Sequence, residues 1–488
     1  KDVQTEEMTG REWQSAVYLR DRWNVSDRLT LSLGLRMEHY PLMKRADRGL
    51  ERLDYDTYEV LIGGRGGVPE DVGINIKTLY FAPRLGAMYR LSDRAVVRAG
   101  YGQTINPLPW SRPLRGSFPQ DIAFSRSADP YLWTTTLAAG IPPVPVPDIS
   151  TGRVKLPQGV FMRSPNPNDV DRGLIQQWNL AYEQRLPWDI SAEIAYVGTR
   201  TDGGYADLNV NYGEPGGGNA ARKYFAVAGT TNINDWAART KSRYHGLQLA
   251  LNRPFADGLM LKGAYTFSRS KNMTSNDEDG WSGLMWNHPL MYDENFATAG
   301  FDRPHVFQMG WLYQLPFLKD DTTALGQVLG GWQLNGIFSA YSGTPYSIFG
   351  SNTALNCQGC GSILIDVSQA PKPTGTPGST TEPYYPVDIF SQPKGLGKAG
   401  FGNSGRNAFR RPSVWNADMS LFKAFNIGRV RQELRVQVTN VFNHVNWDAP
   451  VTSITSPNFM KFTPGSANGF GTNAPGARTI QLGLRVQF

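Results

Sequence analysis

The chain ends on Gln481-Leu482-Gly483-Leu484-Arg485-Val486-Gln487-Phe488, and this stretch decides the fold class. Every second residue from Ile480 onward is apolar, and the residues between them carry amides, a glycine or a positive charge. Because successive side chains of a strand point to opposite faces, the stretch predicts a strand with one apolar and one polar face. A half-buried strand of a soluble β-protein shows the same alternation, so a membrane protein and a soluble protein both remain open here.

The same alternation recurs along the whole chain and indicates an all-β protein. Leu29, Leu31 and Leu33, for example, alternate with polar or small residues. No segment keeps a helical period over ten or more residues. About thirteen strands are predicted, near 13–22, 28–38, 78–91, 94–103, 173–186, 188–199, 241–253, 258–269, 304–315, 330–343, 412–424, 431–442 and 478–488.

Short and long connections alternate between these strands. Short ones lie near 26–28, 92–94, 186–188, 254–258 and 426–430, and a somewhat longer one spans 316–329. Long ones are expected near 39–77, 104–172, 200–240, 270–303, 344–411 and 443–477. Long structureless loops are uncommon in a compact soluble domain. Transmembrane β-barrels have short turns on one side of the membrane and long loops on the other, so the pattern predicts an antiparallel transmembrane barrel.

Composition narrows the function classes further. No apolar run in the 488 residues reaches the eighteen residues of a transmembrane helix. The mean hydropathy of −0.39 is compatible with a barrel, in which only alternate strand residues meet lipid. The net charge of +7 comes from Lys and Arg spread singly, which speaks against a nucleic-acid partner. No secretion leader stands at the start, so we expect a mature, processed or partial chain.

Two cysteines, Cys357 and Cys360, form a C-x-x-C pair followed by Gly361 and a proline-rich stretch. A thioredoxin-like redox site requires a helix after the motif, and a zinc site requires two further ligands nearby. In a loop outside the cell such a pair oxidises, so we predict a local disulfide.

Other candidate sites are weak. The acidic residues Asp277, Glu278 and Asp279 could hold Ca²⁺ through oxygen ligands, but they lack the spacing of a calcium loop, and a solvated loop tip is the favoured interpretation. The five histidines are scattered, and no catalytic or phosphate-binding motif occurs. We therefore expect no catalytic residues, no cofactor and no enzyme activity.

Several motifs carry a resemblance to a known family. The chain resembles TonB-dependent outer-membrane receptors in the hairpin from Trp23 to Arg36, and their Oar-like branch in three further segments, Phe301-Asp302-Arg303-Pro304-His305, Gly405-Arg406-Asn407 with Leu421-Phe422-Lys423, and Val438-Thr439-Asn440-Val441-Phe442-Asn443. The C-terminal residues Gln481, Gly483, Val486 and Phe488 resemble the signal by which bacterial outer-membrane barrels are recognised for insertion.

The resemblance implies an integral protein of the bacterial outer membrane. Members have 22 strands around an N-terminal plug that contacts TonB, so residues 1–488 are expected to be the C-terminal part of such a barrel, without the plug. Counting back from a last strand that runs toward the periplasm places residues 1–12 in an outer loop. The implied partners are the lipid bilayer with lipopolysaccharide, the plug and remaining strands, TonB, and the barrel-assembly machinery.

The function that the resemblance implies is TonB-powered transport of a bulky substrate such as a siderophore, cobalamin, glycan, peptide or protein. A passive porin-like channel or structural scaffold is the first alternative, and a secreted soluble β-protein is the second. Charged residues on the polar faces would point into a hydrated interior, as lipid excludes them. These residues are Arg36, Arg98, Glu193, Arg435 and Arg485.

Overall fold

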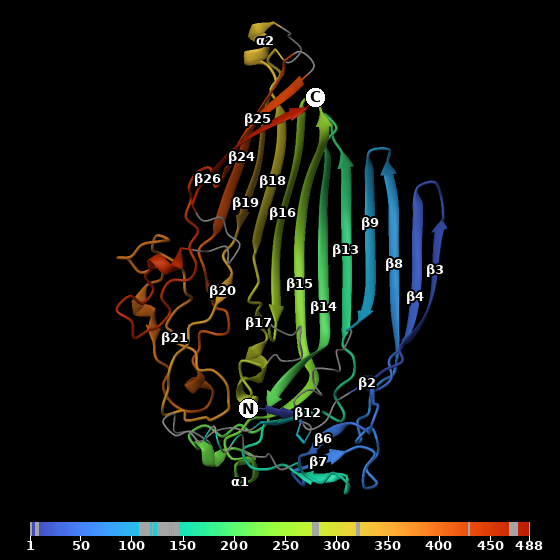
Figure 1. Cartoon of the computed structure of the whole chain (residues 1–488), viewed down its shortest axis with the longest axis vertical. Helices are drawn as coiled ribbons and strands as arrows, with labels where there is room; N and C mark the ends of the chain where they lie inside the picture. The colour runs from blue at the N-terminus through green and yellow to red at the C-terminus, as the bar shows by residue number, and fades with distance from the viewer. Residues whose placement is uncertain are drawn as a thin grey trace.

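The computed structural model describes residues 2–4, 9–106, 118–119, 121–123, 136, 138, 140, 146–275, 283–318, 323–427, 430–467 and 477–487. Its main element is an antiparallel sheet in which thirteen strands follow one another in chain order (Figure 1). We call these strands the wall. They are β3 (Ser15–Asn24), β4 (Leu29–His39), β8 (Leu79–Ser92), β9 (Ala95–Ile105), β13 (Leu174–Arg185), β14 (Ser191–Asn209), β15 (Ile233–Ala256), β16 (Leu259–Asn272), β18 (His305–Gln314), β19 (Trp332–Tyr341), β24 (Val414–Ile427), β25 (Val430–Thr439) and β26 (Thr479–Gln487).

Each of the thirteen predicted strands corresponds to one strand of the wall. The largest differences are at β14 and β15, which continue ten residues beyond 199 and begin eight residues before 241. The added parts pair with each other beyond a register shift between Asp202 and Tyr205, where Gly203 has a φ of +76°. Such a bulge lets the hairpin bend and continue, and a left-handed glycine is invisible to a search for alternation.

The register sorts the side chains of the wall into one apolar and one polar face. Directly opposed residues of antiparallel strands point to the same side of the sheet. Leu484 lies opposite Leu434, and Leu482 lies opposite Val436. Following the pairs across the sheet places most apolar and aromatic residues of the wall on one side and most charged and amide residues on the other. Phe422, opposite Arg435, and Met88, opposite Arg98, are exceptions on the polar side.

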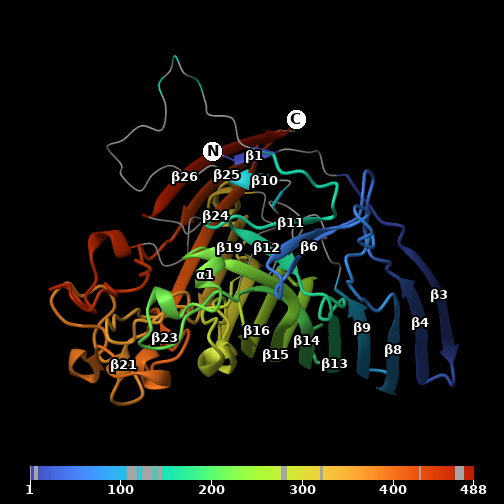
Figure 2. The same cartoon turned by 90° about the horizontal axis from the view of Figure 1, so that it is seen from below.

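The wall is an open arc rather than a closed ring (Figure 2). Among the described strands, β3 pairs only with β4, and β26 pairs only with β25. Every residue of β3 and of β26 is exposed. The outer edges of these two strands therefore present backbone N–H and C=O groups with no neighbouring strand.

The two ends of the arc differ in their connections. The short connections and the C-terminal end of β26 lie at one end, together with α2 (Ala324–Leu329) (Figure 1). The long connections and the N-terminal segment lie at the other end, where β2 (Gly10–Arg11) pairs with β5 (Lys44–Arg45). Among the described residues, no helix is long and apolar enough to cross a membrane.

The long loops are folded, which alternation along the strands does not predict. They fold into a loop cap, by which we mean residues 40–78, 146–173, 210–232, 283–304, 342–413 and 440–467 with the outer parts of β14 and β15. Five clusters of buried apolar side chains lie there. The short elements at this end are β1 (Asp2–Gln4), β6 (Glu51–Asp54), β7 (Glu59–Ile62), β10 (Asp121–Ala123), β11 (Arg153–Lys155), β12 (Met162–Pro165), β17 (Ala297–Thr298), β20 (Pro345–Tyr346), β21 (Asp366–Val367), β22 (Phe390–Ser391), β23 (Phe409–Arg410), α1 (Phe225–Ala228) and the 3₁₀ turns η1 (Asn219–Ala221), η2 (Pro289–Asn295), η3 (Val387–Ile389), η4 (Gly397–Phe401) and η5 (Pro464–Ser466).

Candidate functional site: the polar face and the loop cap

The polar face of the wall carries charges that are paired with one another. Arg98 contacts Glu183 at 2.7 Å and Glu193 at 2.5 Å, across β9, β13 and β14. Arg435 forms an ion pair with Glu433 on the same strand, and Arg485 lies opposite Glu433 in the register. Arg36, Arg98, Glu193, Arg435 and Arg485 thus share one face, as the alternation predicts. Acidic and basic side chains are interspersed, so the face is hydrophilic and has no large region of purely positive or purely negative charge.

Amide and hydroxyl groups continue this face between β19 and β24. The Gln333 side chain donates to Asn335 at 2.8 Å, and Asn335 donates to the Ser420 hydroxyl at 3.4 Å. Asn416 donates to the Asp418 carboxylate at 2.8 Å. These groups offer both donors and acceptors, so the face suits water and polar solutes.

The Phe301–His305 motif joins the cap to the wall at the start of β18. One Asp302 oxygen accepts from the Ser270 backbone N–H at 2.7 Å, and the other accepts from Arg410 at 2.7 Å. Arg303 donates to the Ser342 carbonyl at 3.1 Å. Hydrogen bonds to charged groups are stronger than neutral ones, so this motif is a fixed corner linking β16, β18 and the segment before β24.

The Gly405–Asn407 motif is a second corner. The buried Arg406 guanidinium donates to the Asn295 carbonyl at 3.1 Å and to the Asn272 side chain at 2.8 Å, and Asn407 donates to the Thr298 carbonyl at 2.7 Å. Burial lowers the pKa of Arg406 to about 10, because desolvation disfavours its charged form. The hydrogen bonds to these carbonyl and amide oxygens satisfy the guanidinium.

Asn440 is the centre of a third corner, after β25. Its backbone N–H donates to Asp418 at 2.8 Å, and its side chain exchanges hydrogen bonds with the backbone of His444 at 2.9 and 2.8 Å. The φ of Asn440 is +50°, a conformation that asparagine tolerates better than most residues. Three motifs that carry the family resemblance, around Asp302, Arg406 and Asn440, therefore build the junction between wall and cap. The hairpin from Trp23 to Arg36 and the residues Leu421 to Lys423 lie in the wall itself.

Aromatic packing and a buried ion pair hold the cap above the centre of the wall. Trp236 is fully buried and stacks on Tyr205, with 4.4 Å between ring centroids and 8° between planes. Arg163 on β12 donates to Asp207 at 3.0 Å, and both side chains are buried. Sequence reasoning missed these residues. One signal in the sequence could have indicated a folded cap. Apolar residues alternate within the predicted loops too, as at Val60 and Ile62, which are buried in the short strand β7.

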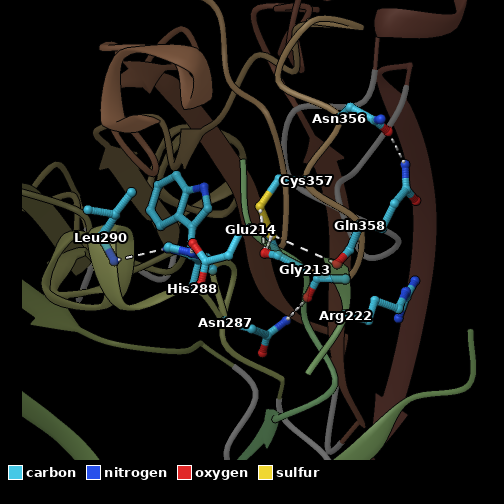
Figure 3. The surroundings of a disulfide bond; sticks show 12 residues. Gly213, Glu214, Arg222, Asn287, His288, Leu290, Asn356, Cys357 and Gln358 are labelled. Carbon is cyan, nitrogen blue, oxygen red and sulfur yellow. Dashed lines mark hydrogen bonds and ion pairs between the residues drawn. A yellow bond between two sulfur atoms is a disulfide. The ribbon is translucent and has the colours of Figure 1, made fainter. Parts of the chain in front are cut away.

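The C-x-x-C segment lies where three loops of the cap meet (Figure 3). Cys357 and Cys360 are joined by a disulfide, and both sulfurs lie 3.1 Å from the Gly213 carbonyl oxygen. The Gly213 N–H donates to the Gln358 carbonyl at 2.8 Å, and the Asn287 N–H donates to the Cys360 carbonyl at 2.7 Å. The segment thus links the β14–β15, β16–β18 and β19–β24 loops through its backbone.

The remaining predicted residues fall in two groups. Gln481 and Gly483 lie on the polar side of β26, and Val486 lies on its apolar side. Asp277, Glu278, Asp279 and Phe488 lie outside the described residues. Within the described ranges, no three side chains of His, Cys, Asp or Glu are grouped to hold a metal ion.

Curated protein sequences give no match. Solved structures similar to the chain include P. aeruginosa FpvA bound to heterologous pyoverdines, with a TM-score of 0.46, 12% identity, and coverage of 98% of this chain and 39% of that one. A second is the siderophore receptor PiuA from Acinetobacter baumannii, with a TM-score of 0.44, 9% identity, and coverage of 98% of this chain and 44% of that one. A third is the outer membrane transporter YddB from Escherichia coli, with a TM-score of 0.44, 9% identity, and coverage of 98% of this chain and 54% of that one.

The chain covers between 39% and 54% of the length of these three structures. The match to a family model is more extensive. Residues 1–481 match the model of the outer membrane β-barrel domain, so this chain belongs to that family and is an integral protein of the outer membrane.

Proposed function

We propose that this chain is the C-terminal part of a TonB-dependent receptor of the Oar-like branch. The complete receptor would take up a bulky substrate across the outer membrane with energy delivered through TonB. The observation that carries the proposal is a wall with a polar, ion-paired face that ends in two unpaired strand edges. The family motifs around Asp302, Arg406 and Asn440 support it by building the junction with the cap. Membership of an outer-membrane family excludes the secreted soluble alternative.

The open edges require further strands. In hydrocarbon, water cannot satisfy unpaired backbone groups, and each such group costs several kcal/mol. The outer edges of β3 and β26 would both face this cost if the wall stood alone in the membrane. We therefore propose a companion of about nine strands with a plug, either in the same precursor or in a separate chain, that pairs with both edges and contacts TonB.

The function needs no bond chemistry from this chain. A folded cap can contact a substrate at the cell surface with preformed loops, which lowers the entropy lost on binding. The polar face behind it carries the ion-paired Arg98, Glu183 and Glu193. Such groups would offer hydrogen bonds along the route and would hold a plug by polar contacts that can be exchanged. Insertion would use the barrel-assembly machinery, and the outer surface would contact lipopolysaccharide.

Uptake measured with and without TonB tests the transport proposal. Cells expressing the complete receptor are given a mixture of ferric siderophores, cobalamin, oligosaccharides and peptides, and accumulated compounds are identified by mass spectrometry. We expect at least one compound to accumulate only in cells with functional TonB. Accumulation that is equal without TonB, together with steady conductance in planar bilayers, would instead identify a passive channel.

Mass spectrometry of undenatured material from outer membranes tests the companion. We expect this chain to co-purify with a second segment of about nine strands, and crosslinks to join that segment to both β3 and β26. Crosslinks between β3 and β26 themselves, with no other polypeptide present, would show that thirteen strands close alone and would reject the proposal.

A further inference from the structure

An aromatic groove lies on the apolar face of the wall, near the end that carries the cap. It crosses β18, β19 and β24 and has a volume of about 560 Å³. The side chains that shape it are His305, Phe307, Phe338, Ala340, Trp415 and Phe442. Their side chains all lie off the polar face. His305 belongs to the Phe301–His305 motif, Phe442 lies in the cap, and Trp415 stacks on His444 of the cap with 4.0 Å between ring centroids. The transport proposal nevertheless gives the groove itself no role.

The groove exists because a small residue stands between large ones. Ala340 lies directly opposite Phe307 on β18 and opposite Trp415 on β24, so its methyl group forms a floor between two aromatic walls. Phe338 continues the lining, with its ring centroid 6.0 Å from Phe307 and 6.1 Å from Trp415. Phe442 packs edge-on against Trp415 at 5.9 Å and is 66% exposed.

The end of the groove nearer the cap is polar. The ring nitrogen Nδ1 of His305 lies 2.7 Å from the Tyr265 hydroxyl. Ser342 and Ser413 also line the groove. The groove therefore changes along the strands from aromatic walls to imidazole and hydroxyl groups. Amphipathic rings of this kind gather where hydrocarbon meets headgroups.

The groove is continuous with the surface that the family places against the membrane. Met309 and Trp311 follow Phe307 on the same face of β18, and Ala417 follows Trp415 on β24. Outer-membrane barrels present their apolar band to lipid, so these residues meet acyl chains. Any occupant of the groove is drawn from that lipid.

We propose that the groove is a binding site for one acyl chain of an outer-leaflet lipid, with the lipid's polar part beside His305 and Ser413. A chain lying between Phe307 and Trp415 gains contacts on three sides, whereas a chain on the rest of the face gains them on one. Each CH₂ group that gains close contacts with the rings adds a small van der Waals attraction, and these attractions sum along the chain. The site thus holds one lipid longer than the surrounding face does.

Photo-crosslinking with a lipid tests the site. The complete receptor is placed in phosphatidylethanolamine vesicles that contain a small fraction of lipid with a diazirine on its acyl chain, and adducts are mapped by mass spectrometry. We expect adducts on Phe307, Phe338, Trp415 and Phe442 at least fivefold above those around Ala99, an exposed residue on the same face flanked by Ala87 and Leu180. Uniform labelling of the face would overturn the proposal.

Variants give a second measurement. Ala340→Trp fills the groove and should reduce its labelling at least fivefold, whereas the matched change Ala99→Trp should leave it unchanged. Phe442→Ala removes one wall at a largely exposed position and should reduce labelling two- to threefold without affecting folding. Undiminished labelling in Ala340→Trp, or crosslinks to another protein in native membranes in place of lipid adducts, would each reject an acyl-chain site.

Discussion

The wall and the loop cap differ in where their apolar side chains lie: those of the wall are largely exposed, and those of the cap are largely buried. The residues of β26 are exposed throughout, including Leu482 and Leu484. The cap instead buries its apolar residues in five clusters, with Trp236 and Trp286 fully enclosed. The wall has lipid on its apolar side and needs no core of its own, whereas the cap is surrounded by water and must form one. Measurements that separate cap stability from wall stability test this comparison.

The largest effect is expected from Trp236→Ala in the cap. Loss of this fully buried ring, stacked at 4.4 Å on Tyr205, should reduce the stability of the cap by about 3–5 kcal/mol. Hydrogen exchange should rise in cap peptides and stay constant in the wall. Trp188→Ala is the control, because Trp188 is 78% exposed in a short turn. Equal exchange in both variants would show that the cap has no core of its own.

The wall should respond to charge according to the face that receives it. Leu484→Arg puts a charge on the lipid side and should destabilise the protein by about 2–4 kcal/mol, if the residue lies near the middle of the bilayer. Arg485→Gln changes the polar side and should cost much less. Refolding of the complete receptor into vesicles over a urea series compares the two. Equal losses would contradict the assignment of faces.

The wall was predictable from sequence because alternation is local. The alternation within each wall strand identifies its apolar and polar faces. A short turn between two strands also indicates that they are antiparallel neighbours in the sheet. The open arc also agrees with a strand count of thirteen. Even the errors at β14 and β15 come from a local feature, the bulge at Gly203, which interrupts the alternation.

The cap was not predictable in the same way because its partners are far apart in sequence. Arg163 meets Asp207, and Arg406 meets Asn272 and Asn295, across separations that no periodic pattern encodes. The motifs containing Asp302, Arg406 and Asn440 were recognised through the family resemblance. Their contacts with the backbone and with other loops emerged only from the three-dimensional arrangement.

A smaller effect is expected at the junction between cap and wall. Arg406→Met keeps an aliphatic chain in place of the arginine stem but leaves the carbonyl of Asn295 and the side chain of Asn272 without their donor. An unsatisfied buried polar group costs about 1–3 kcal/mol, and the loss should appear in exchange of peptides around 272–275 and 295–299. Lys394→Ala, an exposed change in the same loop, should stay within about 0.5 kcal/mol. Indistinguishable exchange in the two variants would show that Arg406 does not hold this corner.

The smallest effect is expected from the disulfide. Cys357 and Cys360 close a very short loop, and the hydrogen bonds from Gly213 and Asn287 involve backbone carbonyls that remain after reduction. The double change Cys357→Ser with Cys360→Ser should therefore cost roughly 0–1 kcal/mol, the low end of the range for disulfides. Exchange should increase only near 211–218 and 355–361, and wall peptides should not change. Alkylation of the untreated, folded protein should find no free thiols. Labelled thiols in that sample would show that the disulfide is not formed. Loss of protection throughout the cap after the double change would show that the whole cap, and not only the adjacent loops, depends on the disulfide.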